Sequence, residues 1–152
     1  MNTYSNNILD TIISEVNSIN DKIKGLNFLE ILKINLIEKL SYINVQNSSL
    51  NQFDQIEKEV STKNRDIKIY VKFFLNSYII SKKLLEQDTL FLSFNESSTF
   101  DIYENEKNFV NIILYKNTGM SLPKNTKINS KFNKNVLMIE ILNKDLGQTL
   151  TN

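Results

Sequence analysis

Few residues in this chain can do catalytic chemistry. Its 152 residues include no histidine, no cysteine and no tryptophan. Without imidazole or thiolate groups there is no zinc finger, haem or iron–sulfur ligand set, Ser-His-Asp triad or Cys-His dyad. The three glycines form no phosphate-binding loop, and no calcium-loop motif is present. We therefore expect no metal and no cofactor, and the composition leans away from an enzyme.

Glu140 is the most conspicuous charged residue, because it interrupts the apolar run from Val136 to Leu142. A carboxylate in a buried strand is costly unless it is paired or faces a solvated cavity. One interpretation is a pocket carboxylate with a raised pKa that acts as a general base. The other is an edge or outward-facing position paired with a lysine. Both interpretations stay open from the sequence.

A second candidate feature is a window of lysines that contains no acid between Glu106 and Glu140. Such a window can be an anion or nucleic-acid contact surface, but it can equally be a solvated strand face. The net charge is only +1, and Arg65 is the single arginine. Arginine recognises phosphates and nucleic-acid bases better than lysine does. We expect no nucleic-acid partner. The lysines are 107, 116, 124, 127, 131 and 134.

The first 65 residues are predicted to be helical. Apolar residues recur every three or four positions over 8–23 and again over 29–43, which indicates two amphipathic helices. Gly25 is expected to end the first helix in a left-handed conformation. A capping-box pattern at Ser49 predicts a third, short helix that carries Phe53 and Val60.

After Asp66 the spacing of the apolar residues changes to every second position, because apolar and polar residues alternate over 67–73. Short segments rich in aromatic and β-branched residues follow, separated by turn formers every eight to twelve residues, which is typical of an all-β sandwich or barrel. A single buried helix over 66–85 is the alternative for the first part. The predicted strands are 78–84, 89–94, 99–103, 109–115, 127–132 and 135–142, with a short strand at 120–122.

The stretch 114–130 resembles the second conserved motif of the cupin superfamily, in which a glycine before a short strand is followed by Pro-x-Gly and then a histidine. Gly119 and Pro123 match that motif, and Asn125 stands where the second glycine belongs. Asparagine is the next-best residue for positive φ, so Gly119 and Asn125 are predicted to lie in turns that flank the short strand. Ile128 occupies the position of the metal-binding histidine, so the resemblance implies the barrel without its usual metal.

The resemblance implies a C-terminal antiparallel cupin-like β-barrel, a double-stranded β-helix. Together with the helices that the hydrophobic period predicts, this gives an α+β protein with N-terminal helices packed on the barrel. The predicted parts are a helical segment 1–65, a barrel 66–146 and a tail 147–152. A cupin-like barrel carries its pocket at one mouth. We name Glu140, Tyr78, Lys82 and Ser130 as candidate ligand-binding residues, and we name no catalytic or metal-binding residue.

The sequence is compatible with two main functions. A third, weaker hypothesis is an enzyme whose only acid–base groups are Glu, Tyr or Lys side chains. The first is a metal-free cupin-like module that binds a small polar ligand or retains the fold without catalysis. The second is a structural or assembly protein whose N-terminal helices mediate oligomerisation or partner docking. We expect a homodimer, with residues 26–43 at the interface or bridging to the barrel. No signal peptide or membrane span is evident, so we expect a cytoplasmic protein with no membrane partner.

Overall fold

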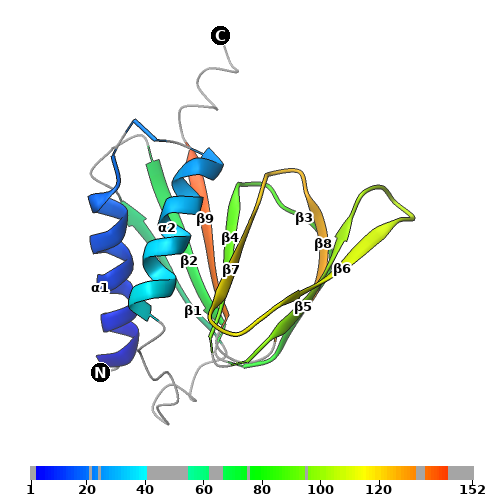
Figure 1. The fold of residues 1–152 in the computed structure, drawn as a ribbon, viewed down its shortest axis with the longest axis horizontal. Helices are drawn as coiled ribbons and strands as arrows, with labels where there is room; N and C mark the ends of the chain where they lie inside the picture. The colour runs from blue at the N-terminus through cyan, green and yellow to red at the C-terminus, as the bar shows by residue number, and fades with distance from the viewer. Residues whose placement is uncertain are drawn as a thin grey trace.

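The computed structural model describes residues 3–20, 22–23, 25–40, 55–61, 67–74, 76–94, 96–132 and 136–143. Figure 1 shows two helices on one side of a pair of β-sheets. The elements are α1 (Thr3–Ser18), α2 (Gly25–Leu40), β1 (Gln55–Ser61), β2 (Ile67–Phe74), β3 (Tyr78–Leu84), β4 (Thr89–Ser93), β5 (Ser98–Tyr103), β6 (Phe109–Leu114), β7 (Thr118–Leu122), β8 (Lys127–Phe132) and β9 (Val136–Asn143).

The strands form a five-stranded sheet of order β1-β2-β9-β4-β7 and a four-stranded sheet of order β3-β8-β5-β6. Every pairing between neighbouring strands is antiparallel. If β2 to β9 are counted as strands one to eight, the sheets read 1-8-3-6 and 2-7-4-5, the order of a double-stranded β-helix, which is a double-sheet jelly roll. The predicted α+β class is confirmed, and 66–85 contains strands rather than one helix.

The helices cover the five-stranded sheet. Alternate residues of β2, β4 and β9 meet the apolar stripe of α2, and α1 packs beside α2. Across the helix pair, Lys39 Nζ lies 2.5 Å from a carboxylate oxygen of Glu15, a residue that is almost fully buried. The hydrogen bond to Glu15 raises the pKa of Lys39. The residues of α2 that are buried in this layer are Phe28, Leu29, Leu32, Leu36 and Leu40.

The predicted third helix is wrong where the structure describes it, because residues 55–61 form the edge strand β1. Its apolar spacing fits a helical period, but tertiary pairing overrides that local signal. β1 pairs with β2 along its whole length. Ion pairs bridge the two strands, Lys68 to Glu59 and Lys72 to Glu57, at 3.3 Å each. Ser49 and Phe53 lie outside the described residues.

Two of the predicted glycine roles need correction. α1 ends at Ser18, and Gly25 opens α2 instead of ending α1, with a φ of 64°. Gly119 lies inside β7 rather than in a turn. A Cβ atom on Gly119 would lie 2.8 Å from Lys33 Cγ and would overlap Leu92 Cδ2, so the glycine allows α2 to approach the sheet closely.

Asn125 has the predicted positive φ, at 71°, in the turn between β7 and β8. Its N–H donates to the Leu85 carbonyl at 2.7 Å, and the Leu85 N–H donates to the Thr126 carbonyl at 2.8 Å. The turn is therefore held to the end of β3 by main-chain bonds on both sides. Among the described residues, no helix combines the length and the apolar character that crossing a bilayer requires.

Candidate functional site

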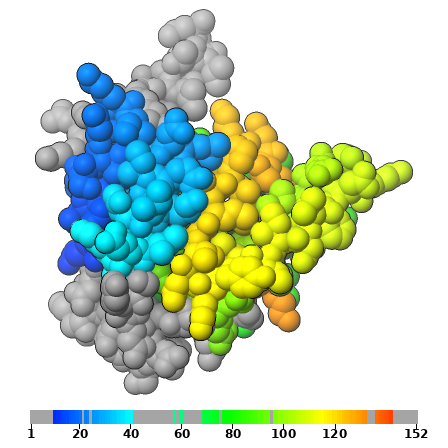
Figure 2. Space-filling view, viewed as in Figure 1, coloured from blue at the N-terminus to red at the C-terminus, as the bar shows by residue number. Residues whose placement is uncertain are grey.

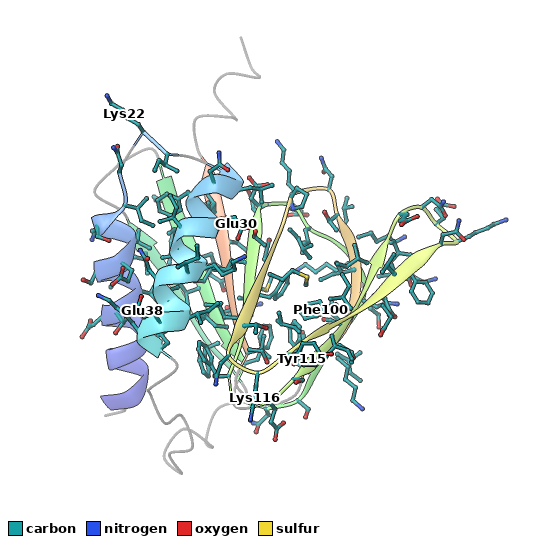
Figure 3. The ribbon with its side chains drawn as sticks, viewed as in Figure 1. Lys22, Glu30, Glu38, Phe100, Tyr115 and Lys116 are labelled. Carbon is teal, nitrogen blue, oxygen red and sulfur yellow. The ribbon has the colours of Figure 1, made fainter. Side chains whose placement is uncertain are left out.

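The space between the two sheets is filled by apolar side chains. Phe100 points into this space (Figure 3), with its ring centroid 4.9 Å from that of Phe91 and 5.4 Å from that of Phe132. The Phe74 ring lies 4.9 Å from Phe132 at one end of the cluster. These four side chains are almost completely buried. The position expected for an internal ligand is therefore occupied by the core itself.

Glu140 lies on the central strand β9, on the face turned towards the four-stranded sheet. It pairs in register with Tyr70 on one side and Thr89 on the other. It is half-buried. The edge-strand interpretation of Glu140 is therefore wrong, and its side chain belongs to the inner face of the five-stranded sheet.

Near Glu140, the inner face of β1 and β2 carries a hydrogen-bonded cluster of charged residues. The Tyr70 hydroxyl donates to Glu57 Oε2, and Lys72 Nζ lies 3.3 Å from Glu57 Oε1. The bond to Glu57 raises the pKa of Tyr70 to about 12, with Glu140 adding a smaller effect of the same sign. The same bond holds the pKa of Glu57 below its usual value. These groups satisfy one another and hold the edge strand β1 to the sheet.

The other predicted site residues lie on the four-stranded sheet. Tyr78 opens β3, is 44% exposed, and its ring centroid is 4.9 Å from that of Phe74. Lys82 lies in a β-bulge between Ile80 and Lys83 and has a φ of 43°. A positive φ is unusual for a residue other than glycine, and such strain concentrates at functional positions.

Ser130 lies on β8, opposite Ile80 and Phe100. Its side chain is 5% exposed, and its Oγ has no hydrogen-bond partner within the described residues. Next to it, Asn129 Oδ1 accepts a hydrogen bond from the N–H of Lys82. The bulge therefore brings Lys82 and Ser130 into one region, whereas Glu140 lies on the other sheet.

A groove of about 310 Å³ opens beside this bulge. It runs across all four strands on the face turned away from the five-stranded sheet, since Phe100 and Ile128 point the opposite way. Seven of its nine lining residues have polar side chains. Together the lining residues are Ile79, Ile80, Ser81, Thr99, Asp101, Asn111, Asn129, Ser130 and Lys131.

Two hydrogen-bonded pairs organise the groove. Asn111 Nδ2 donates to Asp101 Oδ1 at 2.8 Å, between paired positions of β5 and β6. Asn129 Nδ2 donates to the Tyr103 hydroxyl at 2.7 Å. Tyr103 is flanked by the Phe109 ring, 5.4 Å away between centroids, and by Lys127 Nζ at 5.8 Å. These contacts fix the polar side chains of the groove in place.

Of the predicted residues, only Ser130 borders this groove, and its side chain points to the inner face of the sheet, opposite Phe100, while Lys82 adjoins the groove. The prediction missed Thr99, Asp101 and Asn111. The alternation of β5 contained a signal for Thr99 and Asp101, which share one face of that strand, whereas Asn111 lies among apolar residues of β6 and had none. The alternation alone does not say which face is the core.

The described lysines of the acid-free window do not gather into one cluster. Lys107, Lys116 and Lys124 lie in or beside turns, while Lys127 and Lys131 lie on the outer face of β8. Among the described residues, no group of three Asp or Glu side chains comes together in a way that would hold a metal ion.

No protein-family model matches the chain, and no curated protein is similar to it in sequence. Solved structures that resemble it include a cupin superfamily protein of Desulfitobacterium hafniense, with 13% identity, a TM-score of 0.43, and coverage of 66% of this chain and 83% of the other. A Bacillus halodurans protein gives 7% identity and a TM-score of 0.46, with coverage of 66% and 80%. Oxalate decarboxylase of Bacillus subtilis gives 8% identity and 0.45, with coverage of 60% and 28%.

The class is defined by the strand order, which is that of a double-stranded β-helix, the fold that the resemblance in 114–130 implied. At identities of 7–13% and TM-scores below 0.5, the likeness to these solved structures adds no argument about function.

Proposed function

We propose that the protein is a metal-free, non-catalytic cupin-like module that binds a small polar ligand in the groove on the outer face of its four-stranded sheet. The observation that carries this proposal is the contrast between the two faces of that sheet. The inner face is packed with phenylalanines, whereas the outer face carries a groove of about 310 Å³ with polar walls. That volume is near the lower end of the roughly 300–1,000 Å³ typical of small-molecule sites.

The absence of catalysis is proposed from the chemistry of the groove. Asp101 and Lys131 are its only ionisable side chains. Neither forms an acid–base or nucleophile pair with another lining residue, and the sequence holds no histidine or cysteine to supply one. The module would therefore hold its ligand without transforming it.

The proposal is tested by nuclear magnetic resonance on the full-length, ¹⁵N-labelled protein. Amide shifts are followed while small polar compounds are added, first as mixtures and then singly. We expect saturable shifts that map to β3, β5 and β8 and that disappear in Asp101→Ala. Saturable shifts that map to the inner face around Glu140 instead would overturn the proposal. Stoichiometric iron, zinc or nickel in the purified, untagged protein would contradict its metal-free part.

A role in assembly is the second candidate, and the exposed apolar residues favour it. Among the described residues, seven of the eight large apolar side chains that are exposed lie on the edge strands β3 and β6 or directly after β6. They form two groups, because β3 and β6 are the opposite edges of the four-stranded sheet, and groups of exposed apolar residues can mark interaction surfaces. The seven are Tyr78, Ile79, Leu84, Phe109, Val110, Ile113 and Tyr115.

We propose a homodimer as the form this assembly takes. The apolar side of α2 is buried against the five-stranded sheet, so it is not available to a second subunit. The four-stranded sheet, which exposes apolar residues at its edges, is therefore the better candidate for a dimer interface. Figure 2 shows the β5–β6 hairpin projecting on the side away from the helices. Light scattering over a tenfold concentration range tests this proposal, with Leu84→Ser, which lies on β3 outside the groove, weakening the dimer and Ile34→Ser, on exposed α2 surface, as the control. A strict monomer at high micromolar concentration would refute it.

A further inference from the structure

The outer groove has a pattern of free hydrogen-bonding atoms that selects one class of ligand. Within the described residues, Ser81, Thr99 and Lys131 make no side-chain hydrogen bond or ion pair, so they offer free donors. Asp101 Oδ2 and Asn111 Oδ1 are likewise unused, because the bond between these residues joins Asp101 Oδ1 to Asn111 Nδ2. Free donors and free acceptors therefore line the same short groove.

From this pattern we infer that the groove binds a neutral polyhydroxylated ligand of the size of a monosaccharide. The inference rests on the proposed function and names its ligand class. A phosphate or carboxylate mainly accepts hydrogen bonds, and an amine cation only donates them. A hydroxyl group does both at one atom, so adjacent hydroxyls match walls that carry donors and acceptors side by side.

Charge supports the same class. One carboxylate and one ammonium line the groove, so its formal charge is zero. Lys131 is paired in register with Thr99, and Asp101 with Asn129, which places the two charges on diagonal positions of β8 and β5. They form no ion pair, because Asp101 bonds to Asn111 instead. A ligand whose charges all have one sign would meet a charge of that same sign at one of these two positions.

Shape and packing fit a sugar ring. Ile79 is 68% exposed at one end of the groove and offers an apolar surface to the C–H face of a pyranose. The bulge at Lys82 gives this end its form, because the ladder between β3 and β8 is interrupted between Ile80 and Lys83. The Lys82 N–H binds the side chain of Asn129 instead of a ladder carbonyl. A strained main chain held by a lining side chain is a preorganised site.

The experiment extends the amide-shift titration to single compounds of defined class. The neutral probes are the methyl glycosides of glucose, galactose, mannose and N-acetylglucosamine. The charged probes are inorganic phosphate, glycine and spermidine, and a capped dialanine peptide tests a ligand whose amides also donate and accept. We expect at least one glycoside to give saturable shifts at the groove, with an affinity that does not fall with added salt, because a neutral ligand is not screened.

Two variants test the contacts. Asp101→Ala should weaken glycoside binding about tenfold or more, since it removes a hydrogen bond to a charged acceptor. Thr99→Val, which keeps the shape and removes the hydroxyl, should weaken it several-fold. Glu106→Ala, an exposed acid in the turn of the same hairpin, is the matched control and should leave the affinity unchanged. The amide spectrum of each variant reports whether the fold is intact.

The outcomes separate this inference from the proposed function. Saturation of the groove by phosphate, glycine, spermidine or the peptide, but by no glycoside, would overturn the ligand class and leave a polar binding groove in place. No shift at the groove with any probe at millimolar concentration would overturn both. Glycoside shifts that survive Asp101→Ala and Thr99→Val unchanged would also overturn the inference.

Discussion

Replacement of Phe100 by alanine tests whether the interior is a packed core rather than a ligand cavity. The side chain is fully buried, and its ring contacts those of Phe91 and Phe132, with centroid distances of 4.9 and 5.4 Å. Removing a buried phenylalanine costs about 3–5 kcal/mol. Aromatic pairs add about 0.5–1.5 kcal/mol each beyond buried area, so the upper part of that range, about 4–5 kcal/mol, is expected.

Urea unfolding followed by circular dichroism measures this cost. A domain of this size has a total stability of roughly 5–15 kcal/mol, so Phe100→Ala should remain folded in water at all but the lower end of that range. With a urea dependence of about 1–3 kcal/mol/M, its midpoint should fall by about 2 M. Phe109→Ala is the matched control, because this ring is 52% exposed and, among the described residues, its aromatic contact is with Tyr103 alone. Its expected cost is below about 1.5 kcal/mol.

A loss below about 1 kcal/mol in Phe100→Ala would refute the packed interior, since deletion of a fully packed ring cannot be that cheap. An equal loss in Phe100→Ala and Phe109→Ala would refute the assignment of inner and outer faces. Either result would return the candidate site to the space between the sheets.

Three further predictions concern single contacts. Gly119→Ala should destabilise the protein by about 1–3 kcal/mol in urea unfolding, because the added methyl overlaps Leu92 and would lie 2.8 Å from Lys33 Cγ. A variant as stable as the wild-type protein would show that α2 does not pack closely on β7. The hydrogen bond to Glu57 raises the pKa of Tyr70 from 10.0 to about 12, so ultraviolet titration should show one tyrosine that ionises later than an ordinary one. The hydrogen bond therefore adds to the free energy of unfolding below pH 10, and this contribution is lost as the pH rises through 12. Tyr70→Phe should remove both the ionisation step near pH 12 and the loss of stability that accompanies it. Asn125→Gly should be tolerated while Asn125→Val costs about 1–2 kcal/mol, since φ is 71° there; equal costs would contradict the turn.

The strand rhythm after Asp66 could be predicted because its signals are local. Each strand alternates, and each turn contains residues that favour it; Asn125 is an example in which one residue type pointed to one backbone conformation. The strand β1 could not be predicted in the same way. Its apolar spacing fits a helix, and what makes it a strand is the ladder with β2 and the charged pairs across it. Those are tertiary interactions that a window of sequence does not contain.

The site was harder to predict than the fold because alternation defines two faces without saying which is inside. In β5, Phe100 and Ile102 alternate with Thr99, Asp101 and Tyr103. An aromatic lies on each face, so either assignment satisfies the pattern. Glu140 interrupts an apolar run, and that pattern leaves a pocket carboxylate and an edge or outward position both open. Its surroundings depend on the pairing of β9 with β2, whose residues are about seventy positions away in sequence.

The filled interior and the outer groove follow from the same alternation along β8. Ile128, Ser130 and Phe132 point inward, so Lys127, Asn129 and Lys131 must point outward. Ile128 stands where the resembling motif has its metal-binding histidine, and it is completely buried against the phenylalanine core. An apolar residue at that inward position extends the core into the space a polar ligand would need. The polar residues of β8 that remain available are those on the opposite face, where the bulge at Lys82 and the side chain of Asn129 border the groove in which we propose that the ligand binds.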